Sequence, residues 1–420
     1  MGGGMMDNTP KDIVIIGGGI IGIASAALLS EKGHKVTLID RTGITEETSS
    51  GNAGAFAFTD VLPIASKGIM RKLPKWLLDP LGPFTIRPSY LPSLIPWLYQ
   101  FWRASSKSKQ VHTIEAQVAM MGLAEKEMLA LIKRASLENY LGTMGNLEVY
   151  ESENELQSAL PSWKQREKYG IEVRHMKADE MAQLQPGLSP RFVAGSFVEA
   201  WRNVTDPKLF GKALWQYAQN LGAKFIKATI LEITPLENGA KIITDKGEKL
   251  TPNFTIIASG AWSKHFAQKL GDAIPLDTER GYNTTLPTKA LDLRQQVTFG
   301  GHGFVIVPLA TGIRVGGAVE MGGLKLPANF KRCDAMLTKA KTFFPDLKID
   351  GGKQWMGHRP SIPDGLPVIG TAKASPYILY AFGHGHLGLT QSAATARLIN
   401  DIIEKNSSEI SIAPFDPRRF

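Results

Sequence analysis

The sequence predicts an α/β fold of two domains, in which the segments of one domain are interleaved with those of the other. Residues 12–40 have the order strand, glycine turn, helix and strand, because DIVII precedes GGGIIG and HKVTLID follows a helical stretch. The middle of the chain alternates strands with helices and contains hairpin signals around Asn238-Gly239 and Thr311-Gly312. These features predict a Rossmann-like dinucleotide-binding layer and an interleaved antiparallel-sheet domain.

Composition argues against several classes of protein. The 420 residues are 43% hydrophobic, which is enough for a large core. A single cysteine, Cys333, excludes an internal disulfide, and the histidines show no metal-binding pair spacing, so we predict no metal site. We expect neither a secretory signal nor a membrane span. The net charge of +9 is spread along the chain without a dense basic run, so we predict no nucleic-acid partner.

The segment GGGIIG places Gly17, Gly19 and Gly22 in the spacing of a dinucleotide-binding turn. In such a turn the first glycine permits the bend, the second lets a pyrophosphate approach the backbone, and the third lets helix and strand pack closely. The helix N-terminus behind them supplies N–H donors. Asp40 ends the next strand and would accept hydrogen bonds from ribose hydroxyls. An ordinary glycine-rich turn is the alternative interpretation.

Two later segments favour FAD over NAD as the dinucleotide. TIIASGAWS, residues 255–263, is an apolar strand that ends in a turn of small residues. AFGHGHLGLTQSAATARL is a second glycine turn that leads into a helix, whose N-terminus suits the negative charge of a reduced flavin. Each segment alone could equally be a tight corner between a strand and a helix.

Taken together, these segments resemble the D-amino-acid oxidase superfamily of FAD-dependent amine oxidoreductases, and within it bacterial D-amino-acid dehydrogenases. The resemblance runs over nearly the whole chain and also includes TSSGNAG, RGY, VPLATGIRVGGAVE and HRPSIPDGLPVIG. It implies an FAD-binding domain at 11–100, 200–278 and 355–405, and a substrate-binding domain at 101–199 and 279–354.

The resemblance also implies which residues contact FAD. They comprise the pyrophosphate turn, the adenosine side, a loop under the flavin, an adenine contact, and the turn at the flavin pyrimidine. The implied residues are Gly17, Gly19, Gly22, Asp40, Arg41, Ser49, Ser50, Asn52, Ala53, Gly54, Ile230, Ser259, Gly260, Gly383, His384, Gly385, His386, Leu387, Gly388, Leu389 and Thr390. Some relatives attach the flavin to a cysteine near HRPSIPDG. Gly357 stands there in this chain, which implies non-covalent FAD.

Arg359 matches the arginine that grips the substrate carboxylate in relatives with RPxxxDGxPxIG. A guanidinium fork fixes both the position and the orientation of a carboxylate, and we expect Pro360 and Pro363 to hold Arg359 in a rigid turn. His358 replaces the usual leucine before it and either lines the pocket or packs under the turn. Tyr282 and His302 could face the substrate, although a buried tyrosine with a satisfied hydroxyl is an equal alternative.

The function implied is oxidative deamination of a D-amino acid, or of a cyclic imino acid such as D-proline or hydroxyproline, by hydride transfer from Cα to flavin N5. Alternatives are an oxygen-using glycine or sarcosine oxidase, and a flavin- or NAD-binding partner protein without turnover. A quinone or another electron carrier could accept the electrons. We expect a cytoplasmic protein. Residues 84–102 are apolar and broken by prolines, and they are either buried between domains or a peripheral contact with the inner face of the membrane.

Overall fold

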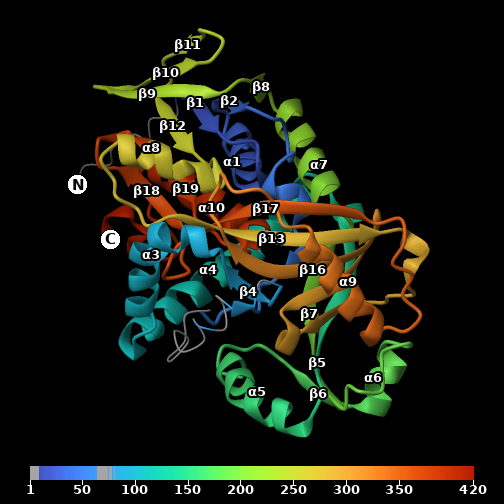
Figure 1. The fold of residues 1–420 in the computed structure, drawn as a ribbon. Helices are drawn as coiled ribbons and strands as arrows, with labels where there is room; N and C mark the ends of the chain where they lie inside the picture. Colours follow the sequence, from blue (N-terminus) through green and yellow to red (C-terminus); the bar gives the residue numbers. More distant parts are fainter. Residues whose placement is uncertain (1–8, 64–73, 75–77, 80) are drawn as a thin grey trace.

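The computed structural model describes residues 9–63, 74, 78–79 and 81–420 and confirms the predicted α/β fold (Figure 1). Two large sheets and one small sheet make up its β structure. Within these described ranges, no helix is both long enough and apolar enough to span a bilayer.

The first large sheet has six strands in the order β18-β19-β12-β1-β2-β8. The pairs along β19-β12-β1-β2-β8 are parallel, whereas β18 is antiparallel to β19. Buried β-branched residues fill the central strand, as is typical of a sheet covered on both faces. The strands are β1 (Asp12–Ile16), β2 (Lys35–Asp40), β8 (Lys224–Lys227), β12 (Phe254–Ile257), β18 (Val368–Ala372) and β19 (Ser375–Phe382).

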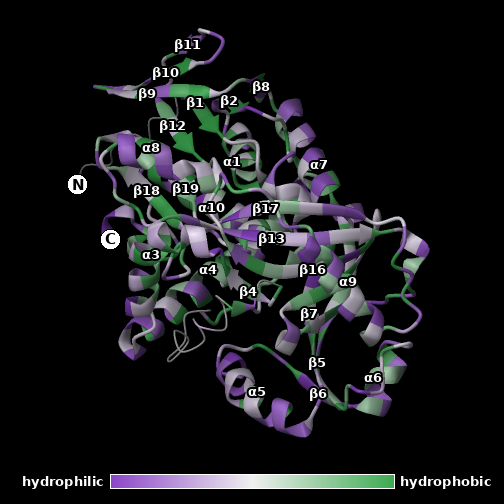
Figure 2. Ribbon diagram, in the orientation of Figure 1, coloured by the Kyte–Doolittle hydropathy of each residue, from purple (hydrophilic) through white to green (hydrophobic). Residues whose placement is uncertain are grey.

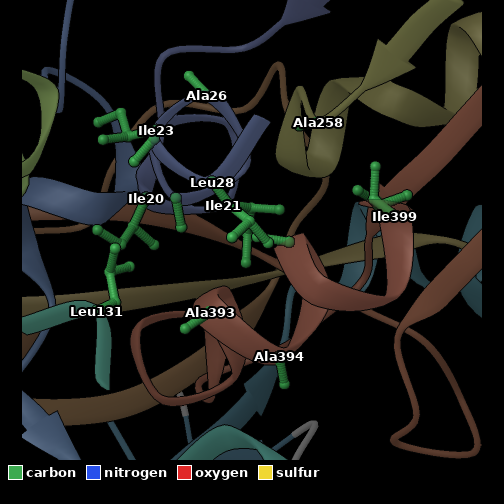
Figure 3. Close-up of a cluster of buried hydrophobic side chains, with 14 of the residues drawn as sticks. Ile20, Ile21, Ile23, Ala26, Leu28, Leu131, Ala258, Ala393, Ala394 and Ile399 are labelled. Atoms are coloured by element: carbon green, nitrogen blue, oxygen red, sulfur yellow. The ribbon is translucent and has the colours of Figure 1, made fainter. Parts of the chain in front are cut away.

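Helices α1, α4, α7 and α10 build the main hydrophobic core with this sheet (Figure 3). α1 contacts both α10 and α7, and α10 contacts α4. Asp206 caps α7 by accepting hydrogen bonds from two backbone N–H groups, as the sequence predicts. The helices are α1 (Ile20–Glu31), α4 (Lys107–Arg134), α7 (Pro207–Asn220) and α10 (Gly388–Ile403).

The second large sheet has the order β17-β13-β16-β15-β14-β5-β7-β3, with β4 paired to β16 and β6 to β7. It is mainly antiparallel, and its strands come from segments far apart in the chain. They are β3 (Ala55–Phe56), β4 (Phe84–Ile86), β5 (Leu141–Tyr150), β6 (Arg174–Lys177), β7 (Ala194–Val204), β13 (Asp277–Leu286), β14 (Gln296–Phe299), β15 (Phe304–Leu309), β16 (Gly312–Met321) and β17 (Lys353–Ser361).

The remaining elements lie around these sheets (Figures 1 and 2). A three-stranded sheet in the order β11-β10-β9 lies at the end of the molecule beyond β1. Its strands are β9 (Ile230–Leu236), β10 (Gly239–Thr244) and β11 (Lys249–Leu250). The other helices are α3 (Leu91–Ala104), α5 (Glu153–Glu167), α6 (Ala178–Leu184), α8 (Ser263–Lys269) and α9 (Lys331–Phe343).

Three features differ from the expectations drawn from the sequence. α4 belongs to a segment that we assigned to the substrate domain, yet its apolar side chains pack into the core beside the first sheet. Conversely, β17 lies in a segment assigned to the FAD domain but pairs with β13 in the second sheet. In the segment 84–102, which we described as broken by prolines, α3 begins at Leu91 and includes Pro92 in its first turn and Pro96 inside.

Candidate active site

Residues from both large sheets line a cavity of about 760 Å³. This volume lies within the range typical of cofactor and small-molecule sites. The glycine turn before α1 and the start of α10 contribute to it from the first sheet. Strands β5, β13, β14 and β17 contribute from the second.

The turn between β1 and α1 and the first turn of α1 each have one position that accepts only glycine. Gly17 has φ +122°, and a Cβ there would lie 2.3 Å from the carbonyl oxygen of Ala258. A Cβ on Gly22 would lie 2.0 Å from the oxygen of Gly17. Gly19 faces the cavity and precedes α1 as an N-cap without a side chain of its own. The start of α1 therefore faces the cavity with its backbone close to the lining, which fits the pyrophosphate of FAD.

Asp40 holds this turn in place through both carboxylate oxygens. Oδ2 accepts a hydrogen bond of 2.7 Å from the Gly18 N–H, while Oδ1 accepts bonds from Thr42 and Gly43. The carboxylate also lines the cavity, so Oδ2 retains a free acceptor position for a ribose hydroxyl. The neighbouring Arg41 guanidinium stacks 4.2 Å from the ring centroid of Trp262.

Hydrogen bonds connect the loop after β2 to helix α1 and to strand β16 of the second sheet. The Ser49 hydroxyl accepts a hydrogen bond of 3.0 Å from the Ile20 N–H at the start of α1. Arg314 on β16 donates to the carbonyl oxygens of Ser50 and Asn52, and burial lowers its pKa. The Asn52 side chain in turn accepts from the Gly54 N–H at 2.7 Å. The backbone of this loop is therefore fixed where it faces the cavity.

The turn before α10 has two residues in the left-handed region, Gly383 at φ +89° and Gly385 at φ +55°. Between them His384 is buried, and its Nε2 lies 2.9 Å from the Thr395 hydroxyl. Burial lowers the pKa of His384 to about 3. His386 points outward and its Nε2 lies 3.0 Å from the Asp60 carboxylate. Both histidines have structural partners, and the N-terminus of α10 faces the cavity.

Most of the residues expected to contact FAD line the cavity. They are Gly17, Gly19, Asp40, Arg41, Ser49, Asn52, Ala53, Ile230, Ser259, Gly260, His384, Gly385, His386, Gly388 and Leu389. The other six, which are not among the lining residues, are Gly22, Ser50, Gly54, Gly383, Leu387 and Thr390. One of them, Thr390 on α10, accepts a hydrogen bond of 3.0 Å from the Ala57 N–H. The glycine cradle and the two open helix N-termini together fit FAD.

Arg359 lies on strand β17, not in the proline turn that we expected, which begins after the strand ends. Its guanidinium lies over Gly281 on β13, where a Cβ would approach Nη2 to 2.5 Å. Burial lowers its pKa, which the charge of Glu279 opposes. Among the described residues it has neither a hydrogen bond nor an ion pair within 4 Å, and the Glu279 carboxylate accepts a hydrogen bond from Ser361. A guanidinium in this state can bind a carboxylate that enters the cavity.

The other three predicted catalytic residues have different surroundings. Tyr282 lines the cavity and is buried, and its hydroxyl bonds Glu320 at 3.3 Å and the Asn329 N–H at 3.0 Å. His302 is not among the cavity-lining residues, because its Nε2 lies 3.0 Å from Glu151.

His358 lines the cavity but packs edge-on against Trp262, with ring centroids 5.5 Å apart. Its pKa is lowered to about 4 by burial and by the charges of Arg280 and Arg41. As its immediate neighbour on a strand, it points to the opposite face from Arg359.

Sequence reasoning missed a group of polar residues on the cavity side of β5 and β14. Asn146 and Glu148 line the cavity, whereas Leu147 and Val149 between and beyond them are buried in the core. The alternation of polar and apolar residues in NLEVY indicates two opposite faces of a strand. The sequence alone does not show which of these faces lies at the cavity. Among the described residues, no cluster of three or more His, Cys, Asp or Glu could hold a metal ion.

Comparison with known proteins agrees with this site. The chain is 36% identical over 422 residues to a D-amino-acid oxidase of Bradyrhizobium diazoefficiens, covering 98% of this chain and 99% of that protein. It is 29% identical over 417 residues to D-amino acid dehydrogenase 1 of Mesorhizobium japonicum, covering 97% and 99%. The glycine oxidase structure from Geobacillus kaustophilus matches with a TM-score of 0.74 at 21% identity, covering 98% and 99%, which concerns the fold alone.

A family model described as "DAO: FAD dependent oxidoreductase" matches residues 12–402, which is most of the chain. The resemblance inferred from the sequence is thereby confirmed, as is FAD as the cofactor. The chain therefore belongs to the DAO family and is an FAD-dependent oxidoreductase.

Proposed function

We propose that this enzyme oxidises a D-amino acid to the imine, which water then hydrolyses to a 2-oxo acid and ammonia. The observation that carries the proposal is Arg359, a partly buried cation that faces the cavity without an ion-pair partner among the described residues. A buried guanidinium is costly unless a counter-charge reaches it, and the carboxylate of an amino acid supplies one. We infer the D configuration of the substrate from the names of the relatives that the chain resembles over nearly its full length.

Bound FAD would supply the hydride acceptor for oxidation at the substrate Cα. The protein binds the carboxylate through Arg359 and so fixes Cα relative to the cofactor, which can contribute several kcal/mol to lowering the barrier. The positive charge of Arg359 also favours the neutral form of the substrate amine, which the reaction requires. Trp163 and Trp201 line the cavity and help to exclude water.

An anaerobic flavin-reduction screen over D- and L-amino acids, including D-proline and hydroxyproline isomers, tests the proposal. We expect the flavin absorbance near 450 nm to bleach with at least one D-amino acid and not with its L enantiomer. A holoenzyme that bleaches with no D-amino acid would contradict the proposal. Bleaching by glycine or sarcosine alone would favour the amine-oxidase alternative.

We propose that the FAD is held without a covalent bond. Cys333 is fully buried on α9, and its thiol lies 3.5 Å from the Asn283 carbonyl oxygen, outside the cavity lining. Acid precipitation should therefore leave the flavin in the supernatant. Flavin that remained in the pellet would contradict non-covalent binding.

We propose further that a membrane quinone accepts the electrons and that α3 meets the membrane. Ile95, Tyr99 and Trp102 share one face of α3 and are 58%, 54% and 56% exposed. Arg103, Lys107 and Lys109 follow them and are exposed as well, and α3 lies at the periphery of the molecule (Figures 1 and 2). Exposed aromatic residues beside basic residues suit an anionic membrane surface. This proposal places the protein in the cytoplasm, at the inner face of the membrane.

Vesicle co-sedimentation tests the membrane contact. The holoenzyme should sediment with vesicles of phosphatidylglycerol and phosphatidylcholine, and less with phosphatidylcholine alone. Trp102→Ser should weaken binding, whereas Tyr169→Ser, an exposed aromatic elsewhere, should not. Equal sedimentation of Trp102→Ser and wild type would contradict the contact.

Re-oxidation of the reduced flavin tests the electron acceptor. Re-oxidation by a quinone but not by oxygen would support a dehydrogenase, whereas fast re-oxidation by oxygen would favour an oxidase.

A further inference from the structure

We propose that Glu148 makes the enzyme prefer D-amino acids whose side chain ends in a cation, such as D-lysine and D-arginine. This inference rests on the proposed function and concerns the same cavity. It assigns to Glu148 the role of a specificity-determining residue at the end of the cavity opposite Arg359.

Glu148 is fixed by the sheet that carries it. It follows Leu147 on β5, whose side chain is in the core, so the alternation of the strand directs Glu148 to the cavity. Its Oε1 lies 2.9 Å from the position that a Cβ on Gly300 would take. The glycine therefore leaves room for the carboxylate beside the end of β14.

The polar neighbours of Glu148 are already paired with one another. The Thr298 hydroxyl donates a hydrogen bond of 2.7 Å to the Asn146 side chain. Asp60 lies 3.0 Å from His386 and 3.8 Å from Arg166. Arg166 also donates to the Ser162 hydroxyl at 2.7 Å. The guanidinium of Arg166 therefore pairs with Asp60 and forms no ion pair within 4 Å with Glu148.

Glu148 itself has no ion pair within 4 Å among the residues that the structure describes. Burial raises its pKa, against the opposing influence of Arg166 and of the Tyr150 hydroxyl. A carboxylate that loses hydration without gaining a counter-ion is unfavourable. A cation entering the cavity would remove this cost, whereas an apolar side chain would leave it.

The distance between the two charged groups matches a long cationic substrate. The Arg359 guanidinium lies over β13 and the Glu148 carboxylate lies beside the end of β14. Strands β16 and β15 separate them, so the lateral span is three strand spacings, roughly 14 Å. Extended lysine measures roughly 7–8 Å from carboxylate carbon to ammonium nitrogen. Adding the carboxylate C–O bond and an N···O contact of about 3 Å at each end gives roughly 14–15 Å.

The kinetic test compares D-lysine with D-norleucine, which has nearly the same length and no charge. For the wild-type holoenzyme we expect a higher kcat/KM with D-lysine. In Glu148→Gln the ratio of the two kcat/KM values should fall about 10- to 100-fold, because a charge-assisted contact is lost. Glu151→Gln is the matched control: it removes the same charge next to β5, but Glu151 is not among the cavity-lining residues and bonds His302. It should leave the ratio within about twofold.

A binding measurement separates recognition from chemistry. 6-Aminohexanoate and hexanoate lack the α-amine and cannot be oxidised, and they differ only in the terminal ammonium. Titration of the flavin absorbance should show tighter binding of 6-aminohexanoate to the wild type. Glu148→Gln should lose this difference, and Glu151→Gln should keep it.

The outcomes distinguish failure of this inference from failure of the proposed function. If no D-amino acid reduces the flavin, the proposed function fails. If D-norleucine reduces it as well as or better than D-lysine in the wild type, only the role of Glu148 is overturned. An unchanged ratio in Glu148→Gln would also overturn it.

Discussion

The second large sheet, which has ten strands, surrounds its buried charged residues differently on its two faces. On the core face, the Arg280 guanidinium bonds Glu320 at 3.1 Å and four carbonyl oxygens of the loop after β16. The Tyr282 hydroxyl joins the same network through Glu320. On the cavity face, Arg359 and Glu148 have no ion pair within 4 Å among the described residues.

This difference separates groups that maintain the fold from groups that bind a ligand. Buried polar groups are normally satisfied within the protein, and the core face follows that rule. Exceptions are expected at functional sites, where the missing partner belongs to the ligand. One sheet thus carries an arginine that is bonded within the protein on one face, Arg280, and an arginine that we propose binds the substrate carboxylate on the other, Arg359.

The largest effect is expected from Arg280→Met, which breaks the network on the core face. Glu320 is fully buried and would lose its cation, and four carbonyl oxygens would lose their donors. Breaking a buried ion pair on one side costs about 3–5 kcal/mol of the free energy of unfolding. Urea unfolding measures this loss. The double change Arg280→Met with Glu320→Leu should recover part of it, and a loss below about 1 kcal/mol for the single change would contradict the interpretation.

Arg359→Met should have the opposite pattern, with lost activity and retained stability. Losing the carboxylate partner should lower kcat/KM by about 30- to 5,000-fold, equivalent to about 2–5 kcal/mol. The free energy of unfolding of the apoprotein should stay the same or rise, because a partly buried charge without an ion pair is removed. Stopped-flow flavin reduction and urea unfolding give the two quantities.

Gly281→Ala is a control that keeps Arg359 but moves it. Its Cβ would meet the guanidinium at 2.5 Å, and the side chain would have to shift. An intermediate loss of kcat/KM is expected, chiefly through KM.

If Arg359→Met lowered the free energy of unfolding as much as Arg280→Met, the contrast between the two faces would be wrong.

The part of the molecule that follows from local sequence was predictable. The turn at Gly17, the acid Asp40 and the second glycine turn lie within single segments, and the observed strands β1 and β2 have nearly the predicted bounds. A phosphate cradle is made of backbone, so its signature is the glycine spacing itself. The resemblance of these segments to a known family added the prediction that Arg359 binds the substrate carboxylate.

The surroundings of that arginine could not be predicted, because they depend on pairing between distant strands. The register that places Glu279 opposite Arg359 joins residues on β13 and β17, which are far apart in the chain. That register also brings the Tyr282 hydroxyl within hydrogen-bond distance of Glu320 in the core network, although Tyr282 lines the cavity as well. The predictions for Tyr282 and His302 were made from each residue alone. They lacked this information, because the face on which a side chain lies is known only once the strands are paired.

His358 pairs with Arg280 across the strands and directly precedes Arg359. Its pKa in the folded protein is about 4, below the ordinary value near 6.5, because of burial and nearby arginines. The unfolded chain therefore binds the proton more readily. The contribution of neutral His358 to stability is complete above about pH 6.5 and is lost as the pH falls toward 4, by at most about 1.4 kcal/mol per pH unit.

Unfolding free energies measured between about pH 7 and pH 5 test this expectation. His358→Gln should show a shallower decline than the wild type. His112→Gln removes an exposed histidine from α4 and should follow the wild-type curve. Parallel curves for His358→Gln and the wild type would show that His358 is not held neutral.

The smallest effect is expected from His302→Gln, which tests whether this histidine has any part in the cavity. His302 stacks on Phe343 with ring centroids 4.8 Å apart and bonds Glu151 outside the cavity lining. Glutamine can keep the hydrogen bond to Glu151, so stability should change by less than about 0.5 kcal/mol and kcat/KM by less than about twofold. A larger fall in kcat/KM at unchanged stability would place His302 in contact with substrate in the working enzyme, and the cavity face would then extend past the end of β14.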